Sequence, residues 1–236
     1  MRVLVVTAVP AEADAVSGGL GEATATRQGL PGGYVLARHP RADVLAAGVG
    51  PAAAAAGTAT ALASAAISAT PSPSPYDLVV SAGIGGGFQP LAPVGSLVVA
   101  DAIVAADLGA ETPGGFLPVD ELGFGRTRHH PPPELAARIA RLLDAVHAPV
   151  LTVSTVTGSA SRTGELTARH PRAAAEAMEG FGVAEAAAAY ALPVIEIRAV
   201  SNAVGPRDRS AWRIGPALDA LRYAFQQLSP VFEESP

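Results

Sequence analysis

Two carboxylates lie where the sequence predicts a turn of the chain, and carboxylates there can hold the hydroxyls of a sugar. Glu12 follows the first apolar run directly, beside the carboxyl end of a strand, where ligands of α/β sheets bind. Helix propensity over Ala173–Glu179 meets Gly180 and Gly182, so we expect Glu179 at a chain reversal. A carboxylate accepts hydrogen bonds from a diol more strongly than a neutral group does. Each carboxylate also has an explanation without a ligand: the dipole at the start of a helix favours Glu at position 12, and Glu179 can be a solvated residue of a turn.

A charge and an amide stand on the apolar segment Val194–Asn202, which reads VIEIRAVSN. Arg198 must find a carboxylate there, because a buried and unpaired charge is costly. Asn202 ends the strand, carries both a donor and an acceptor, and suits the edge of an amide-like ligand. Asn is equally common in strand-ending turns without any ligand, so the residues alone leave both interpretations open.

A glycine run follows the third predicted strand and reads SAGIGGG over residues 81–87. We expect a tight turn there, whose backbone N–H groups can approach a small polar ligand or water without obstruction. A dinucleotide fingerprint is excluded because Phe88 stands where the third glycine belongs, and Pro90 and Pro93 deny the helix that would follow. A tight turn without a ligand is the alternative.

The composition of the 236 residues excludes several classes of function. The chain contains no Cys, which excludes disulfides, thiol nucleophiles and Cys-ligated zinc, and no Lys, which excludes Schiff-base chemistry and a Walker-type phosphate lysine. The net charge is −5 and no basic run occurs, so we expect no nucleic-acid partner. His129 and His130 are adjacent rather than i,i+4, so we expect no metal, and no GxSxG elbow suggests a serine hydrolase.

Short β-branched runs alternate with alanine-rich stretches, which predicts an α/β fold with a central mixed β-sheet flanked by helices. The predicted strands are Val3–Val9, Val44–Val49, Leu78–Ser81, Ser96–Ala105, Val150–Thr155 and Val194–Ser201. The predicted helices are Pro51–Ser68, Glu134–His147, Val183–Ala191 and Pro216–Leu228. The strands are apolar almost throughout, which favours burial of both faces of the sheet.

Two Pro-rich segments are predicted to be irregular. Thr70–Pro75 reads TPSPSP and predicts a stiff surface connection, not a domain boundary, so we expect one domain over residues 1–236. Thr112–Pro133 is long for a connection in a compact domain, which is typical of lids and of disordered segments. The first residues lack a signal-peptide pattern and no stretch offers the roughly 20 apolar residues of a membrane span, so we expect a soluble, cytoplasmic protein.

Taken in order, these motifs resemble the nucleoside phosphorylase/nucleosidase family. The resemblance depends on Glu12 after the first strand, SAGIGGGF followed by PVGSLVVAD, AMEGFGVAEAA and EIRAVSN, and it covers most of the chain. It implies a mixed sheet flanked by helices, a small-molecule purine nucleoside as substrate, no cofactor and a homo-oligomer (dimer or larger). The whole-chain pattern, including SNAVGPRD, is most similar to the branch that hydrolyses futalosine, a hypoxanthine nucleoside of an alternative menaquinone pathway.

The resemblance also implies roles for single residues. Glu12 matches the carboxylate that activates water, and Asn202 occupies the position that recognises the base. The matches to residues that bind or flank the substrate are Gly83, Ile84 and Gly85 of the glycine run, the ribose-binding pair Met178 and Glu179, and Arg198 and Ser201.

Two departures from the family pattern refine the expected reaction. Relatives specific for adenine carry Asp where this chain has Asn202, and a neutral amide cannot deliver a proton but can bond N7 and O6 of hypoxanthine. Phosphorylases of the family carry a phosphate-binding Arg on the strand that enters the glycine run, and here Leu78–Ser81 contains none. We therefore expect water as the nucleophile and a 6-oxopurine as the leaving group. Asp208 is a candidate auxiliary acid, and Arg126 or Arg128, from this chain or a neighbouring subunit, is a candidate partner for the carboxylate on the 5′ side of futalosine.

Three other functions remain open on the sequence. The first is another purine nucleosidase or phosphorylase, acting on inosine, methylthioadenosine or S-adenosylhomocysteine. The second is a non-catalytic nucleoside-binding protein of the same fold. The third, weakened by the glycine spacing, is a dinucleotide-dependent oxidoreductase.

Overall fold

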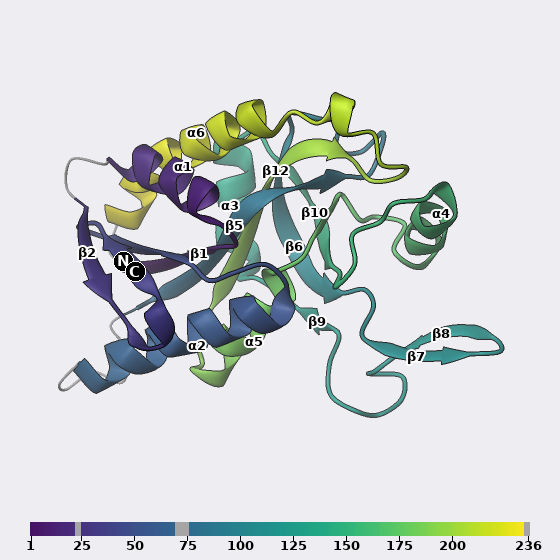
Figure 1. Ribbon diagram of the computed structural model, residues 1–236, viewed down its shortest axis with the longest axis horizontal. Coiled ribbons are helices and arrows are strands. Elements are labelled where there is room, and N and C mark those ends of the chain that lie inside the picture. The colour runs from purple at the N-terminus through teal and green to yellow at the C-terminus, as the bar shows by residue number, and fades with distance from the viewer. Residues whose placement is uncertain (22–24, 69–75, 234–236) are drawn as a thin grey trace.

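A computed structural model describes residues 1–21, 25–68 and 76–233 of the chain, and ten strands of this part form one mixed sheet (Figure 1). The strand order is β11-β10-β6-β12-β5-β1-β4-β3-β2, with β9 paired to β6. These strands are β1 Val3–Thr7, β2 Thr26–Gly29, β3 Val35–Arg38, β4 Ala42–Ala46, β5 Leu78–Gly87, β6 Leu97–Ala105, β9 Arg128–His129, β10 Val146–Thr152, β11 Ala175–Ala177 and β12 Val194–Ala203. The fold is the α/β class, with a central mixed sheet, that the sequence predicts.

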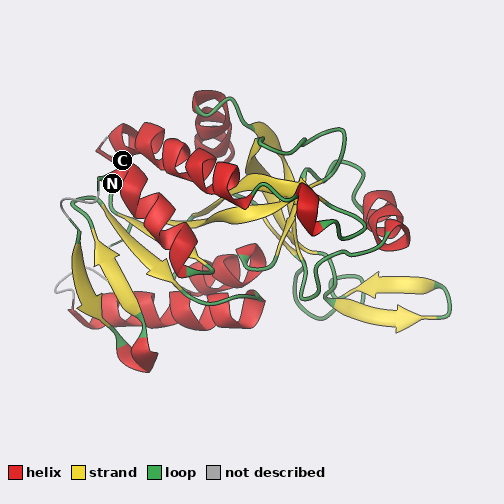
Figure 2. Cartoon of the chain, turned by 45° about the horizontal axis from the view of Figure 1, so that its top comes forward, coloured by secondary structure: helices red, strands yellow, loops and turns green. Residues whose placement is uncertain are grey.

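Helices cover both faces of the sheet (Figures 1 and 2). On one face α1, α3 and α6 pack on Val3, Val5 and their neighbours, and on the other α2 and α5 pack on Leu4 and Val6. The alternation of successive strand residues between two clusters is the expected result of a strand's period of two. The helices are α1 Pro10–Leu20, α2 Pro51–Ser68, α3 Pro133–Leu142, α4 Ala160–Arg169, α5 Gly180–Ala189 and α6 Ile214–Glu233, with 3₁₀ turns at Pro31–Gly33 and Arg209–Ala211.

Strands β1, β5 and β12 run parallel at the centre of the sheet. Their apolar residues are buried almost throughout, because helices cover both faces, as the sequence predicts. The carboxyl ends of these three strands therefore meet at one edge of the molecule. This edge is where the residues with candidate chemistry collect.

The glycine run lies inside β5 and not in a turn, which corrects the sequence prediction. The first half of β5 pairs with β1, and its end pairs with β11 through Gly86 and Gly87. None of these glycines has a positive φ, so conformational freedom is not the reason for them. A Cβ on Gly87 would lie 2.1 Å from the carbonyl oxygen of Ala92, so the strand needs glycine for close packing.

The predicted helix Pro51–Ser68 has the same bounds in the structure, whereas Glu134–His147 was predicted too long. That helix ends at Leu142, because Asp144 takes a positive φ and the chain enters β10 at Val146. Helix α4 and strand β11 were not predicted at all. In the described part of the chain, no helix is long and apolar enough to cross a membrane.

The two Pro-rich segments have different outcomes. Thr70–Pro75 falls within residues 69–75, outside the described part of the chain. Much of Thr112–Pro133 is ordered: β7 (Gly109–Thr112) and β8 (Gly115–Pro118) form a hairpin that projects from the molecule in both views, and the chain then returns to the sheet at β9. The prediction that this segment acts as a lid stays a prediction.

Candidate active site

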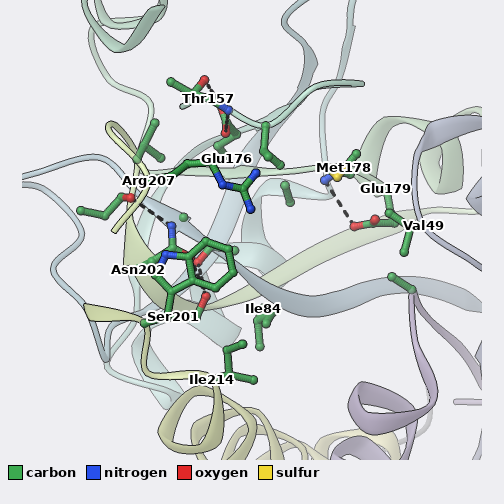
Figure 3. A pocket seen from close by; sticks show the side chains of 18 of the residues that line it. Val49, Ile84, Thr157, Glu176, Met178, Glu179, Ser201, Asn202, Arg207 and Ile214 are labelled. Carbon is green, nitrogen blue, oxygen red and sulfur yellow. Dashed lines mark hydrogen bonds between the residues drawn. The ribbon is translucent and has the colours of Figure 1, made fainter. Parts of the chain in front are cut away.

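A cavity of about 400 Å³ opens at the carboxyl ends of β1, β5 and β12 (Figure 3). It is the place where the sequence argument for ligands at strand ends leads. Seven segments form its walls: the loops after β1, β4 and β10, the ends of β5 and β12, the β11–α5 junction, and the segment that leads into α6. The residues that line it include Val9, Glu12, Val49, Ile84, Gly85, Thr157, Glu176, Met178, Glu179, Ser201, Asn202, Arg207, Trp212 and Ile214.

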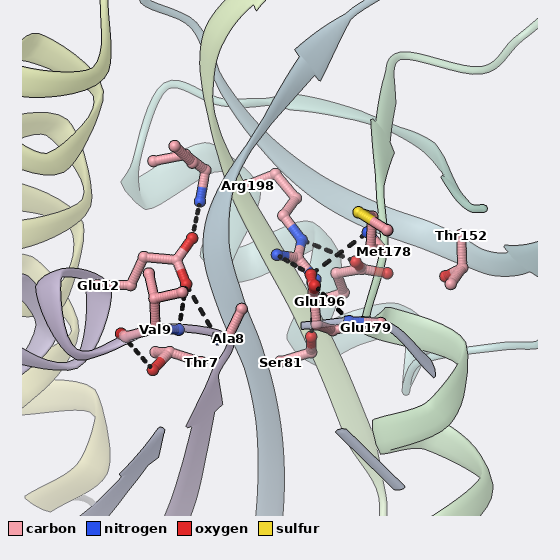
Figure 4. A network of polar contacts seen from close by, with 12 residues as sticks. Thr7, Ala8, Val9, Glu12, Ser81, Thr152, Met178, Glu179, Glu196 and Arg198 are labelled. Atoms are coloured by element: carbon pink, nitrogen blue, oxygen red, sulfur yellow. Dashed lines mark hydrogen bonds and ion pairs between the residues drawn. The ribbon is translucent and has the colours of Figure 1, made fainter. Parts of the chain in front are cut away.

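Glu12 lies in the first turn of α1 and is 3% exposed, yet it lines the cavity. Its Oε2 accepts hydrogen bonds from the N–H groups of Ala8 (2.9 Å) and Val9 (3.2 Å). Its Oε1 accepts from the N–H of Ile84, on β5, at 2.9 Å (Figure 4). The position of Glu12 at the start of a helix therefore explains only the contacts of Oε2, which bonds to N–H groups just before α1. The other oxygen is tied to a distant strand and keeps a lone pair for a ligand.

Glu179 stands at the N-cap of α5 and is 6% exposed. Its carboxylate accepts hydrogen bonds from the N–H groups of Gly50 (3.2 Å) and Met178 (3.3 Å). The predicted helix over Ala173–Glu179 is wrong: Ala175–Ala177 is a strand, and the helix starts at Gly180.

The glycines of the EGFG segment start α5 rather than break a helix, for reasons of packing. A Cβ on Gly180 would lie 2.2 Å from Oε2 of Glu196. A Cβ on Gly182 would lie 2.0 Å from the carbonyl oxygen of Pro51, at the start of α2. Gly180 thus makes room for the Glu196 carboxylate, and Gly182 lets the start of α2, and with it the N–H of Gly50, approach the Glu179 carboxylate.

Arg198 is fully buried and finds the carboxylates that the sequence argument requires (Figure 4). Its Nε donates to Oε1 of Glu196 at 2.9 Å and its Nη2 donates to Oγ of Ser81 at 3.1 Å. Its Nη1 lies 3.3 Å from Oε2 of Glu179, an ion pair without hydrogen-bond geometry. Burial opposes the charge on Arg198, but the carboxylates of Glu196, Glu179 and Glu12 raise its pKa above the ordinary value.

Glu12, Glu179, Glu196 and Arg198 together form what we call the inner network. Arg198 and Gly83 are not among the residues that line the cavity, and their expected contact with a substrate stays a prediction. Arg198 lies behind Glu179, and Gly83 is packed so closely that a Cβ would come within 2.6 Å of Oε1 of Glu12 and 2.7 Å of Nη1 of Arg198. Both residues shape the inner network.

The remaining residues predicted from the sequence do line the cavity: Ile84, Gly85, Met178, Ser201 and Asn202. The Ser201 hydroxyl lies 2.8 Å from Oδ1 of Asn202 and can donate to it. Nδ2 of Asn202 donates to the carbonyl oxygen of Ala203 at 2.9 Å. These contacts orient the amide and leave one of its N–H groups for a ligand.

Four further lining residues were missed by the sequence analysis: Thr157, Glu176, Arg207 and Trp212. Glu176, on β11, is buried and accepts hydrogen bonds from the N–H (2.8 Å) and the hydroxyl of Thr157. Burial raises the pKa of Glu176 above its ordinary value, although the hydrogen bonds from Thr157 act in the opposite direction. The Arg207 guanidinium lies over the Trp212 ring, 5.3 Å from its centroid. With Asn202, these four residues form what we call the outer wall.

Asn202 was predicted, but only weak signals in the sequence pointed to the other four residues of the outer wall. Glu176 stands three residues before Glu179, and Arg207 lies in the motif SNAVGPRD. No periodicity or spacing distinguishes either from a solvated charge, because the residues that bring them to the cavity are remote in sequence.

The candidate auxiliary groups lie elsewhere. Asp208 is exposed, does not line the cavity, and accepts hydrogen bonds from Ser210 that hold its pKa below the ordinary value, so it is unsuited to donate a proton. Arg126 lies 3.5 Å from Glu185, and Arg128 is in β9; neither lines this chain's cavity. Among the described residues, no group of three or more His, Cys, Asp or Glu side chains could hold a metal ion.

Comparison with known proteins places the whole chain in one family. The sequence model of the phosphorylase superfamily matches residues 2–227. A futalosine hydrolase from Streptomyces coelicolor is 61% identical over 234 residues, which cover 99% of this chain and 97% of that protein. A futalosine hydrolase from Acidothermus cellulolyticus is 47% identical, over 95% of this chain and 89% of that protein.

Solved structures share the fold at much lower identity. A methylthioadenosine/S-adenosylhomocysteine nucleosidase from Colwellia psychrerythraea, in complex with adenine, superposes with a TM-score of 0.76 at 22% identity, covering 97% of this chain and 96% of that one. The native structure of a futalosine hydrolase from Helicobacter pylori gives 0.77 at 16% identity, covering 98% of each chain.

Proposed function

The chain belongs to the phosphorylase superfamily, and from that membership we propose that it hydrolyses the N-glycosidic bond of futalosine and releases hypoxanthine. Its two similar relatives described above are futalosine hydrolases. The observation in the structure that best supports an N-glycosidic hydrolase is the convergence of Glu12, Glu179 and Asn202, remote in sequence, on one cavity. We propose further that residues 1–236 form a single nucleosidase domain, which acts without a cofactor, in the cytoplasm, as a homo-oligomer.

Cleavage of an N-glycosidic bond develops positive charge on the sugar, in an oxocarbenium-like transition state. We assign the ribose to the inner side of the cavity, where Glu179 accepts hydrogen bonds from the sugar hydroxyls and Met178 packs on the ring. The Glu179 carboxylate is held by backbone N–H groups and by Arg198, so it needs no rearrangement when charge develops.

We assign the role of general base to Glu12. One of its oxygens accepts from the N–H of Ile84 and retains a second lone pair, which can take a proton from a water on the face of the sugar away from the base. A carboxylate at this place repels a phosphate dianion, whereas it attracts the proton of a water molecule. The position of Glu12 therefore favours hydrolysis over phosphorolysis.

The leaving base is assigned to the outer wall, with Asn202 at N7. Ser201 fixes Oδ1 of Asn202 as an acceptor, so the remaining N–H of the amide can donate to the purine. Val9, Val49 and Ile214 form an apolar side of the cavity, which suits the aromatic group on the 5′ side of futalosine.

The test is base release by the purified protein. It is incubated with futalosine, inosine, adenosine and methylthioadenosine, with and without phosphate, and hypoxanthine or adenine is measured together with the sugar product. We expect hypoxanthine from futalosine at a rate independent of phosphate. Release of adenine alone, formation of a sugar 1-phosphate, or stoichiometric binding without turnover would each contradict the proposal.

A further inference from the structure

The outer wall carries more polar groups than the binding of N7 by one amide requires. Asn202, Arg207 and Glu176 all line the cavity, and in the view of Figure 3 the Arg207 side chain is drawn between the other two. The Arg207 guanidinium forms no hydrogen bond and no ion pair with any residue in the described ranges, although it lies over Trp212. The outer wall thus presents three polar groups to the cavity: the Asn202 amide, the unpaired Arg207 guanidinium and the Glu176 carboxylate.

This order of groups matches one edge of a 6-oxopurine. Along that edge N7 accepts, O6 accepts and N1–H donates a hydrogen bond. A 6-aminopurine has the opposite pattern beyond N7, because its exocyclic nitrogen donates and its N1 accepts. A guanidinium donates only, and an ionised carboxylate accepts only, so the two groups fit the first pattern and oppose the second.

We propose that Glu176 and Arg207 select a 6-oxopurine base, with the Glu176 carboxylate accepting from N1–H and the Arg207 guanidinium donating to O6. The inference rests on the proposed function, since it places the purine of the substrate at the outer wall. It names Glu176 and Arg207 as residues that determine base specificity, a role that the sequence analysis gives to neither.

The contacts of Glu176 suit it to this role. Thr157 donates two hydrogen bonds to the carboxylate, which fixes its orientation, and each carboxylate oxygen retains lone pairs for a ligand. Glu176 is only 5% exposed, so a bond to it is formed away from water. A site whose buried polar groups are built for one edge discriminates strongly, because the wrong edge leaves those groups unpaired.

The experiment compares hypoxanthine with adenine as free bases, and futalosine with its analogue that carries an amino group at C6. Binding constants are measured by calorimetry and kcat/KM by base release, for the wild type and Glu176→Gln. We expect the wild type to prefer each oxopurine by about 100-fold or more. Glu176→Gln should weaken hypoxanthine binding about 10- to 100-fold and leave adenine binding equal or tighter, since Gln can donate to N1 of adenine.

Two further variants separate recognition from structure. Arg207→Met removes the donor to O6, so it should weaken hypoxanthine binding about tenfold and spare adenine. Thr157→Val keeps the carboxylate but removes a bond that orients it, so a smaller loss of the same preference is expected. Equal binding of both bases by the wild type, or equal weakening of both by Glu176→Gln, would overturn the inference. If the wild type prefers hypoxanthine but releases no base from futalosine, the proposed function fails and the base selection stands.

Discussion

The inner network and the outer wall lie in one cavity but satisfy their charges in different ways. In the inner network Glu12, Glu179, Glu196 and Arg198 are almost fully buried and bond to each other or to backbone N–H groups. In the outer wall Glu176 and Thr157 are buried as well, but Arg207 is exposed and Asn202 and Trp212 are partly exposed. The difference indicates that protein contacts hold most polar groups of the inner network, although Oε2 of Glu196 and Nη1 of Arg198 lack a hydrogen bond within the described chain. In the outer wall the Arg207 guanidinium is left to a ligand.

This contrast separates the chemistry of bond cleavage from the choice of base. Groups held in fixed positions away from water stabilise developing charge without reorganising, which the sugar requires. Groups that lack partners in the described chain gain most from a ligand with matching donors and acceptors, which the purine supplies. Substitutions in the inner network should therefore reduce turnover or folding, and substitutions in the outer wall should change selectivity.

The largest effect is expected for Glu12→Gln. The amide is nearly isosteric but cannot take the proton of water, so kcat should fall by about 10²- to 10⁴-fold while binding of the released base stays within a few-fold. The measurement is steady-state hydrolysis together with calorimetric binding of hypoxanthine. Full turnover by the variant would remove Glu12 from the mechanism and erase the chemical distinction between the two regions.

Arg198→Met should cost about 3–5 kcal/mol of unfolding free energy, because it leaves two buried carboxylates without their cation. Arg207→Met is the matched control in the outer wall. The guanidinium there is exposed and forms no ion pair within the described chain, so unfolding free energy should change by about 0.5 kcal/mol or less. Denaturant titration measures both, and equal losses would mean that the two regions do not differ in structural role.

The inner network could be predicted in part from the sequence, and the outer wall hardly at all. Arg198 in an apolar strand requires a carboxylate by electrostatics alone, and Glu12 and Glu179 stand at predicted chain turns. The closeness of Glu176 to Thr157 depends on the parallel pairing of β11 with β10, the strand that Thr157 follows, and this pairing leaves no periodic signal in three residues. Apolar strands and the helix at Pro51–Ser68 were predictable from local pattern, whereas the end of α3 was set by the start of β10.

The glycines show the same limit. Their number near residue 83 predicted a turn, but the structure uses them for close packing inside β5, and packing against Glu12 and Arg198 is invisible in a linear sequence. Gly180 and Gly182 were interpreted as helix breakers, but they lie in the first turn of α5, where close packing against Glu196 and Pro51 requires glycine.

Gly83→Ala should have an intermediate effect on the inner network. The added Cβ would lie 2.6 Å from Oε1 of Glu12, so the carboxylate must move, and we expect about 1–3 kcal/mol of lost stability and at least a tenfold lower kcat. Gly164→Ala is the control: the glycine is in α4, nothing lies within 4 Å of its added Cβ, and stability should be unchanged or slightly higher. Differential scanning calorimetry and kcat measure the pair, and unaltered turnover in Gly83→Ala would show that Glu12 tolerates displacement.

The smallest effect is expected from pH and concerns the outer wall alone. Burial raises the pKa of Glu176 above the ordinary value, against hydrogen bonds from Thr157 and attraction by Arg162, while Asp107 adds to the rise. Because the folded state then holds this proton more tightly than the unfolded state, the contribution of Glu176 to stability falls as pH rises from about 4.3, its unfolded value, through the raised pKa. Hypoxanthine binding needs the ionised carboxylate and should change oppositely, tightening a few-fold as pH rises through the same range. Calorimetric titration at several pH values, with Glu176→Gln as the reference, measures this; an equal pH dependence in both proteins would assign the titration to another group and leave Glu176 without a part in base binding.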